Sequence, residues 1–470
     1  MSFYSVTFAV FFTAVVVLYF LLPQARRILV LLAASVLFYL SFTPQYIFVV
    51  FALILLDYCA GIFIEKASGR SRKAWLALSL SANLGLMAAF KYIPAVLGIP
   101  AGPMPLGLSF HTFQAMAYTI EVYRGRQPSE RSLSVFAVYV LFFPQLAAGP
   151  IERPQNLMPQ FREVHVFSSA NAVAGLQLVA WGLYEKYVVA DRLGNVVNPV
   201  YARLDMCSGP LVAFAALCFP FQILCDFSGY SDIAIGTAQI LGFRLSQNFN
   251  RPFHADSMAE YWKRWHISLS LWMRDYVFFP LCGRRPGMVR ICASIMTTLL
   301  ANGLWHGAQW NYLASGLLHG SYRVTELICG RAISRSGWAL HSFWVRPVRV
   351  ARTILVFLLM AFAFIFFRGE SLAHSFHIIR RLFTGWGSIM NPSALAQQLP
   401  AIGFSPTFLV RALLIICTVE TVQFLQARGP LRPRIALAPA WVRWGLYYAG
   451  VIALLTLANH NQAPFIYFQF

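Results

Sequence analysis

The chain has 470 residues, of which 58% are hydrophobic and only 11% are charged. A soluble globular protein carries about 25% charged residues, so this composition excludes an ordinary soluble fold. The net charge of +20 comes from 37 Lys and Arg residues against 17 Asp and Glu residues. These basic residues stand in short loops between apolar runs, a pattern that indicates a multi-pass membrane protein and argues against a nucleic-acid-binding surface.

A series of apolar runs predicts the membrane helices, each of which needs about 20 mostly apolar residues. In chain order the runs are Val6–Leu22, Ile28–Phe42, Tyr46–Ile64, Trp75–Leu97, Leu106–Val122, Leu133–Ala148, Ala172–Ala190, Pro210–Cys225, Ile291–Leu304, Ala308–Cys329, Ile354–Phe367, Phe408–Leu425 and Trp441–Asn459. Several are short or contain Gly, Pro and polar residues, which are tolerated at membrane depth only inside protein or beside a water-filled cavity. We therefore expect re-entrant segments at Leu106–Val122, Phe227–Phe243 and Ile291–Ala314. The predicted fold is an all-α polytopic membrane protein.

The charges of the loops predict an orientation. Basic residues follow the first, third and fifth runs, at Arg26–Arg27, Arg70–Lys73 and Arg124–Arg131. The loops after the second and fourth runs, near Thr43–Gln45 and Gly98–Pro103, contain no Lys or Arg. Because Lys and Arg are retained on the cytoplasmic side, this alternation places the N-terminus outside the cytoplasm.

The stretch from Arg244 to Arg290 is too polar to span a membrane, yet it is rich in aromatic residues. Ser257-Met-Ala-Glu260 has the form of a capping box that opens a helix, and Pro280 is expected to end that helix. Apolar residues follow the capping box at steps of three and four, namely Trp262, Trp265, Leu269, Trp272 and Tyr276. This spacing predicts one amphipathic helix that lies at the cytoplasmic interface.

Two histidines are candidate functional groups, because ionisable residues within membrane segments are costly. His306 stands at the end of an apolar run, and His266 lies on the amphipathic helix. A neutral imidazole can take a proton from an attacking hydroxyl near neutral pH. Asn302 precedes His306 by four residues and therefore shares its helical face, where it can orient the ring. Asn311 and His319 follow nearby, although the spacing of the histidines is not that of zinc ligands.

Two further segments are polar at the predicted membrane depth. Cys225–Asp232 is expected to place Asp226 and Asp232 around a Gly-containing turn, and Phe143–Ile151 to form a Pro- and Gly-broken helix end that carries Gln145. Either segment could serve only as a bend whose side chains satisfy freed backbone groups. The eight cysteines contain no C-x-x-C pair, so neither a disulfide framework nor a zinc site is expected. A seryl nucleophile is unsupported, since no G-x-S-x-G motif occurs in a suitable context.

Together and in this order, these segments resemble the membrane-bound O-acyltransferase superfamily, and most of all its alginate O-acetyltransferase branch. The resemblance is carried by Pro105–Phe110, Phe143–Ile151, Cys225–Asp232, Asn248–Pro252, Tyr261–Ser270, Arg274–Tyr276, Gly303–Gly307 and Phe465–Phe470. The sequence departs from the pattern at His111, where a tyrosine is expected, and at Cys282 and Arg284, which interrupt an expected Gly-Gly-Asn turn. These departures leave open which polymer is modified.

The resemblance implies a helical bundle around a tunnel, formed by a single membrane domain over residues 1–470. Within it, residues 105–330 would form the catalytic core, and residues 1–104 and 331–470 the flanking helices. His306 corresponds to the family's catalytic histidine in its Trp-His-Gly stretch, and His266 to a second family histidine. Residues expected to support catalysis or bind substrate are Asn302, Asn311, Asp226, Tyr230, Asp232, Trp305 and Arg274. Lys263 and Arg264 are expected to contact the phosphates of the acyl donor.

The same resemblance implies acyl transfer from a cytoplasmic thioester, acetyl-CoA in the alginate-like branch, towards hydroxyls of an exported polysaccharide such as alginate. Periplasmic esterase-like partner proteins would complete the transfer. The chain would then lie among the lipids of the bacterial inner membrane, with no bound cofactor, no metal and no nucleic-acid partner. Three alternatives stay open: D-alanyl transfer to teichoic acid from a carrier-protein thioester, a transporter, and a non-catalytic scaffold of an export complex.

Overall fold

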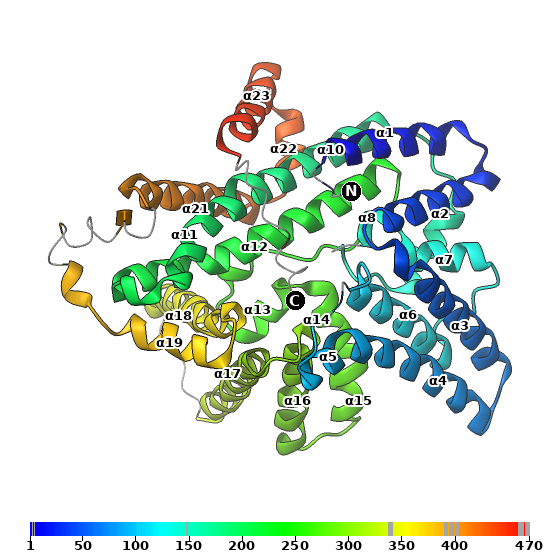
Figure 1. Cartoon of the computed structure of the whole chain (residues 1–470), viewed down its shortest axis with the longest axis horizontal. Helices are drawn as coiled ribbons and strands as arrows, with labels where there is room; N and C mark the ends of the chain where they lie inside the picture. Colours follow the sequence, from blue (N-terminus) through cyan, green and yellow to red (C-terminus); the bar gives the residue numbers. More distant parts are fainter. Residues whose placement is uncertain are drawn as a thin grey trace. The chain divides into compact units, whose positions relative to one another are not determined.

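The computed structural model of the chain describes all residues except 2, 4, 101, 103, 147–148, 337–341, 390–392, 394–398, 401–403, 459–464 and 466–470. Every regular element within the described residues is helical, which confirms the predicted all-α polytopic fold (Figure 1). Of the segments discussed above, Phe465–Phe470 is described only at Phe465, while Ala147, Ala148 and Asn459 lie outside the described residues.

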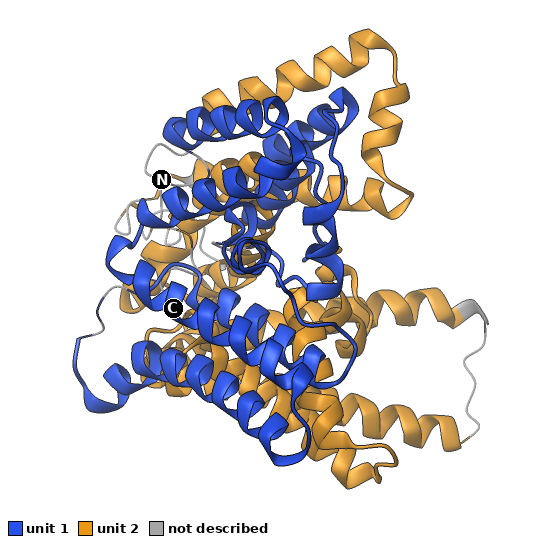
Figure 2. Ribbon diagram, turned by 90° about the vertical axis from the view of Figure 1, so that its right-hand side faces the viewer, with its two compact units in different colours: residues 1–181, 230–248 blue, residues 182–229, 249–470 orange. Residues whose placement is uncertain are grey.

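The chain divides into two compact units, residues 1–181 with 230–248 and residues 182–229 with 249–470 (Figure 2). The first unit contains α1 Val6–Leu21, α2 Gln24–Leu40, η1 Pro44–Tyr46, α3 Ile47–Lys66, α4 Gly69–Met87, η2 Ala88–Tyr92, α5 Ile93–Leu97, α6 Leu108–Tyr123, α7 Leu133–Leu141, α8 Phe143–Leu146, α9 Pro154–Leu157, η3 Pro159–Arg162 and most of α10 Ser169–Tyr184. The η labels mark 3₁₀ and π-helical segments.

The long helix α12 Gly209–Ile240 contributes residues to both units. The other elements of the second unit are η4 Glu185–Ala190, α11 Asp191–Ala202, η5 Leu204–Met206, η6 Pro252–His254, α13 Met258–Arg264, α14 Ile267–Met273, η7 Arg274–Phe278, α15 Phe279–Cys282, α16 Met288–His306, α17 Trp310–Arg335, α18 Ser342–Arg368, α19 Leu372–Leu382, η8 Trp386–Ile389, α21 Pro406–Ala427, α22 Leu431–Leu437 and α23 Ala440–Leu457.

Seven helices of the described chain are long and apolar enough to cross a membrane. They are Pro44–Lys66, Gly69–Leu97, Gly209–Ile240, Met288–His306, Trp344–Arg368, Thr407–Ala427 and Ala440–Leu457. Each contains one of the predicted runs or most of it. The remaining runs also form helices, but each of these is too short, too weakly apolar or too highly charged to meet the same criteria. The protein is therefore a multi-pass membrane protein.

Buried polar side chains connect the helices of the first unit. Asp57 of α3 accepts hydrogen bonds from Ser79 Oγ at 2.6 Å and from Asn83 Nδ2 at 2.9 Å, both on α4. Gln145 of α8 donates to Gln114 Oε1 of α6 at 2.8 Å. Such interhelical bonds satisfy polar groups that water cannot reach. The predicted broken helix end is confirmed, because α7 stops before the short helix α8 begins.

The predicted turn at Cys225–Asp232 is wrong, because this segment lies inside α12, which continues without a break to Ile240. The expected re-entrant segment Phe227–Phe243 lies mostly in the same helix. Gly229, which suggested the turn, is needed for packing instead. A methyl group on this residue would lie only 2.6 Å from the carbonyl oxygen of Gly182. The glycine therefore lets two helices approach closely and does not turn the chain.

The predicted amphipathic helix is interrupted. Its start is confirmed, because Ser257 Oγ accepts a hydrogen bond from the Glu260 N–H at 3.2 Å. The helix α13 nevertheless ends one residue before Trp265, and the chain turns at His266, whose φ of 40° and ψ of 57° lie in the left-handed region. A left-handed backbone at a residue other than glycine costs about 1–2 kcal/mol. Tertiary packing therefore holds His266 in place.

The rest of this stretch continues as α14, the π-helical segment η7 and the short helix α15. The prediction that Pro280 ends the run is wrong. Pro280 stands in the first turn of α15, where a backbone N–H would have no partner within the helix. The chain leaves the helix at Gly283, which has a φ of 75°. The apolar stripe still packs inward, because Trp265, Leu269 and Trp272 are buried.

Candidate active site

Helices α16 and α17 pack together through glycines. A methyl group on Gly303 would lie 2.4 Å from the carbonyl oxygen of Tyr312, and one on Gly316 would lie 2.6 Å from that of Leu299. Gly307, between the helices, makes room for the Tyr312 ring, whose Cε2 would lie 2.7 Å from an added methyl group. These close approaches bring the C-terminal end of α16 against the first turns of α17.

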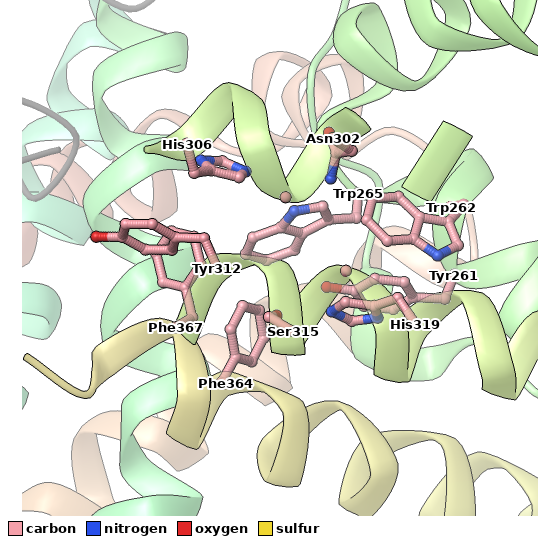
Figure 3. Close-up of a pocket in the computed structure, with 12 residues that line it drawn as sticks. Tyr261, Trp262, Trp265, Asn302, His306, Tyr312, Ser315, His319, Phe364 and Phe367 are labelled. Atoms are coloured by element: carbon pink, nitrogen blue, oxygen red, sulfur yellow. The ribbon is translucent and has the colours of Figure 1, made fainter. Parts of the chain in front are cut away.

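A cavity of about 30 Å³ lies at this place, within the second unit (Figure 3). Its walls come from α13 and the residue directly after it, Trp265, and from α16, α17 and α18. The lining residues are Tyr261, Trp262, Trp265, Asn302, Gly303, His306, Tyr312, Ser315, Gly316, His319, Phe364 and Phe367. Asn302 and His306 both line it from α16, which confirms the predicted shared face. The wall is mostly aromatic, with a few polar groups among the rings.

The indole ring of Trp305 packs against both predicted catalytic histidines. The Trp305 ring centroid lies 4.8 Å from that of His306 and 5.9 Å from that of His266, with an angle of 73° between planes in each pair. Phe367 packs almost perpendicular to His306 at 4.9 Å, and Phe227 almost perpendicular to His266 at 4.7 Å. Edge-to-face contacts of this kind favour one orientation of each ring. His306 lines the cavity, whereas His266 is not among the lining residues.

His266 is suited to orientation and not to charge stabilisation. The side chain is buried, and burial lowers the pKa of His266 to about 3. The imidazole is therefore neutral near pH 7, with one ring nitrogen that donates a hydrogen bond and one that accepts. A neutral ring packed on Trp305 can help to fix the geometry around His306, but it brings no positive charge to the reaction.

Asn311 supports the cavity wall from outside. It is completely buried on α17, and its Nδ2 donates a hydrogen bond to the carbonyl oxygen of Gly369. Gly369 directly follows α18, the helix that carries Phe364 and Phe367. The bond therefore ties α17 to the end of α18, so that both walls of the cavity keep their spacing.

Asp226 belongs to a buried ionic cluster and does not line the cavity. The Lys186 Nζ lies 2.7 Å from Asp226 Oδ1 and 2.9 Å from Asp191 Oδ1, and all three side chains are only 2% exposed. The cluster ties α12 to η4 and α11. The next residue of α12, Phe227, is the one that packs on His266. Asp226 is thus placed to hold α12 in position beside the second histidine.

The predicted donor-binding residues Lys263 and Arg264, and the predicted substrate-binding residue Arg274, each pair with an acidic neighbour. Lys263 and Arg264 both pair with Glu260, at 3.6 Å and 2.9 Å. Arg274 pairs with Asp275 at 2.8 Å. The Lys263 side chain is 75% exposed, which leaves it accessible to an anionic group. None of these side chains lines the cavity.

Tyr230 and Asp232 fall in the first unit, whereas the cavity belongs to the second. Tyr230 is buried there, with its ring centroid 4.9 Å from that of Phe3. Asp232 is partly exposed on α12. Neither residue is among those that line the cavity.

Sequence reasoning missed a large part of the cavity wall. In the sequence, His319 is notable only as a residue near His306, at a spacing that does not fit a zinc site. Trp262 is predicted there to belong to an interfacial stripe. The spacing of Tyr312, Ser315 and His319 at three and four residues places them on one face of α17, and this signal was available. Phe364 and Phe367 carried no signal, because an apolar helix contains many such residues.

The family model of MBOAT, the membrane-bound O-acyltransferase family, matches residues 105–368, a span that contains every residue lining the cavity. The chain belongs to this family. As a membrane-bound O-acyltransferase it is an enzyme that transfers acyl groups to oxygen. Among the described residues, no group of three or more His, Cys, Asp and Glu side chains could hold a metal ion.

This O-acyltransferase is similar to curated proteins over most of its length. It is 30% identical to a probable alginate O-acetylase, AlgI, of Pseudomonas putida, over 96% of each chain. It is 33% identical to the corresponding protein of Azotobacter vinelandii, over 78% of this chain and 74% of the relative. The peptidoglycan O-acetyltransferase of Helicobacter pylori is 30% identical, over 74% of this chain and 72% of the relative.

Proposed function

We propose that this enzyme transfers an acetyl group from acetyl-CoA, bound from the cytoplasmic side, towards hydroxyl groups of an exported cell-surface polysaccharide such as alginate. The observation that carries the proposal is the position of His306, which ends an apolar helix and lines a small aromatic cavity together with Asn302. The names of the similar proteins, two probable alginate O-acetylases and a peptidoglycan O-acetyltransferase, support acetyl as the acyl group and a glycan as the acceptor.

His306 acts as the general base in this reaction. The neutral imidazole takes the proton of the acceptor hydroxyl while the hydroxyl oxygen attacks the carbonyl carbon of the thioester. The electron pair of the carbonyl double bond moves to its oxygen and then returns as the carbon–sulfur bond breaks. The imidazolium gives its proton to the departing sulfur, which leaves as the CoA thiol. The products are an acetyl ester and a free thiol, and His306 is again neutral.

The donor phosphates would lie against the basic side of α13. Lys263 and Arg264 stand on this short helix between Trp262 and Trp265, which line the cavity. A thioester with its acyl end in the cavity would therefore pass along the helix that carries both basic side chains. Arg and Lys are the residues that pair with phosphate groups.

The proposed location is the bacterial inner membrane, with the N-terminus on the periplasmic side and periplasmic partner proteins that complete the transfer. Labelling of single cysteines at Thr43 and Arg284, in a cysteine-free background, tests this orientation. An impermeant thiol reagent applied to intact cells should reach position 43 and leave position 284 unlabelled. The opposite pattern would show that the topology is inverted.

The test of the function is the acetyl ester content of the cell-surface glycan, normalised to the amount of enzyme in the membrane. Loss of a general base typically lowers a rate by about 10²–10⁴, so His306→Ala should abolish detectable transfer. His306→Gln keeps hydrogen bonding without taking up the proton, and it should fail as well. His266→Ala should be severe but retain some activity, because its role is to orient.

His377→Ala is the matched control, since this partly exposed histidine of α19 pairs with Asp205 and does not line the cavity. It should leave the ester content unchanged. Near-normal ester content in His306→Ala at normal enzyme abundance would refute the catalytic assignment. D-alanyl esters in place of acetyl esters would refute acetyl-CoA as the donor.

A further inference from the structure

Two polar groups of the cavity have no part in the reaction described above. His319 is only 6% exposed, and its Nδ1 has no hydrogen-bond partner within the described part of the chain. The Trp262 Nε1 is likewise buried without a partner there. The two rings meet edge to face, with centroids 5.2 Å apart and planes at 76°. Both line the same cavity as His306 (Figure 3).

The chemistry of these two groups restricts what can bind them. Buried polar groups in proteins are almost always hydrogen-bonded, so a pair without partners beside a cavity indicates that a ligand supplies one. An indole N–H can only donate, and the ligand atom must therefore be an acceptor. A neutral histidine protonated at Nδ1 provides a second donor. One oxygen with two lone pairs and no proton of its own, such as a carbonyl oxygen, accepts from both.

The size of the cavity restricts the ligand further. A space of about 30 Å³ is room for about two water-sized groups, since one water needs roughly 10–15 Å³. A carbonyl oxygen and a methyl group fill that room. Phe364 and Phe367 of α18 supply an apolar wall that suits the methyl group, and a longer acyl chain would collide with it.

We propose that this cavity is the acyl subsite, in which Trp262 Nε1–H and His319 Nδ1–H donate hydrogen bonds to the acyl carbonyl oxygen and Phe364 limits the acyl group to two carbons. The inference rests on the proposed acetyl transfer. When the acceptor oxygen bonds to the carbonyl carbon, the electron pair displaced onto the carbonyl oxygen lies between the two donors, which stabilise the negative charge. The pair returns as the carbon–sulfur bond breaks, and His306 delivers the proton to sulfur.

The first experiment measures transfer from radiolabelled acetyl-CoA to glycan, in inside-out membrane vesicles of the strain that makes the polysaccharide. Removal of one such donor typically lowers kcat by about 10²–10³, so Trp262→Phe and His319→Leu should each do so with little change in KM. His319→Asn keeps an N–H near the position of Nδ1 and should recover part of the loss. Trp272→Phe, a buried tryptophan of α14 outside the cavity, is the matched control.

The second experiment reads the carbonyl directly and needs no turnover. In full-length His306→Ala, difference infrared spectroscopy with ¹³C-carbonyl acetyl-CoA should show a carbonyl band below its frequency in free acetyl-CoA, because hydrogen bonds weaken the double bond. Adding Trp262→Phe or His319→Leu should move the band back towards the free value. A structural role for either residue would leave the band unchanged.

The third experiment measures acyl selectivity. Phe364→Ala should raise the rate with propionyl-CoA and butyryl-CoA relative to acetyl-CoA at least tenfold. Phe366→Ala removes the same volume from the same helix, at similar burial but outside the cavity, and should leave the ratio unchanged.

These experiments distinguish failure of the proposed acetyl transfer from failure of the proposed acyl subsite. Absence of acetyl transfer by the unaltered enzyme would refute the proposed function itself. Acetyl transfer that depends on His306 but keeps its kcat and carbonyl band in Trp262→Phe and His319→Leu would overturn the subsite. Selectivity that does not respond to Phe364→Ala would overturn the limit on acyl length.

Discussion

Replacing Lys186 by methionine tests whether the buried ionic cluster holds the second unit together. The ammonium group lies within 3 Å of two carboxylates, at 2.7 Å from Asp226 and 2.9 Å from Asp191, and each of the three side chains is only 2% exposed. Removing one partner of a buried ion pair typically costs about 3–5 kcal/mol, because it leaves an uncompensated charge. Lys186→Met leaves two carboxylates, so the free energy of unfolding should fall by at least that much.

Companion variants separate loss of charge balance from loss of packing. Asp226→Asn keeps the shape of the side chain and leaves the pair between Lys186 and Asp191, so it should cost only about 1.5–3 kcal/mol, the value of a hydrogen bond to a charged group. The triple variant Lys186→Met, Asp191→Asn, Asp226→Asn has no buried charge left in this cluster. It should regain much of the stability that Lys186→Met loses.

The assay is thermal unfolding in mild detergent, followed with a dye that reacts with thiols as they become exposed. Cys218 and Cys225 are buried on α12, and Cys207 and Cys282 are buried elsewhere in the second unit. The dye therefore reports on unfolding of this unit, above the constant signal of the exposed Cys329 and Cys417. Lys66→Met, at the exposed end of α3, is the control and should leave the midpoint unchanged. An unchanged midpoint in Lys186→Met, combined with lost acetyl transfer, would refute the structural role and assign Asp226 to substrate binding.

Three further predictions concern the surroundings of the cavity. Trp265→Glu places a charge where the buried indole stacks on Tyr261 at 5.8 Å, so the folded yield in detergent should fall well below that of Trp265→Phe; equal yields would show that this face is not packed. Burial lowers the pKa of His266 to about 3. Between about pH 6.5 and 3 the imidazole of His266 is therefore protonated in the unfolded chain and neutral in the folded one. Stability should therefore fall by roughly 1.4 kcal/mol per unit of acidification in that window. His266→Asn, which tolerates the left-handed backbone, should reduce the slope of unfolding midpoint against pH, and an identical slope would contradict the burial argument. Gly316→Ala would bring a methyl group to 2.6 Å from the Leu299 carbonyl oxygen and should cost about 1–3 kcal/mol in the same assay, unlike Gly330→Ala further along α17, where an added methyl group has open space.

Several features were predictable from the sequence because their causes are local. Hydropathy and loop charge identify a membrane protein without any knowledge of tertiary contacts. The helical period alone places Asn302 and His306 on one face, and the capping box at Ser257 needs only residues within one turn. The short motif around His306 was enough to identify this residue as a candidate functional group. In the last three cases the residues concerned are at most four positions apart.

Other features depended on contacts between distant segments, and only the tertiary structure decided them. Gly229 resembles a turn residue in sequence, yet it serves the packing of α12 on Gly182. His266 interrupts a regular apolar stripe because the residues packed around it hold its backbone in a left-handed conformation. His319 joins the cavity of His306 only because glycines let α16 and α17 approach within a few ångströms. The period of a helix determines which residues share a face, but the neighbours that meet that face are determined by packing between helices, which no local pattern encodes.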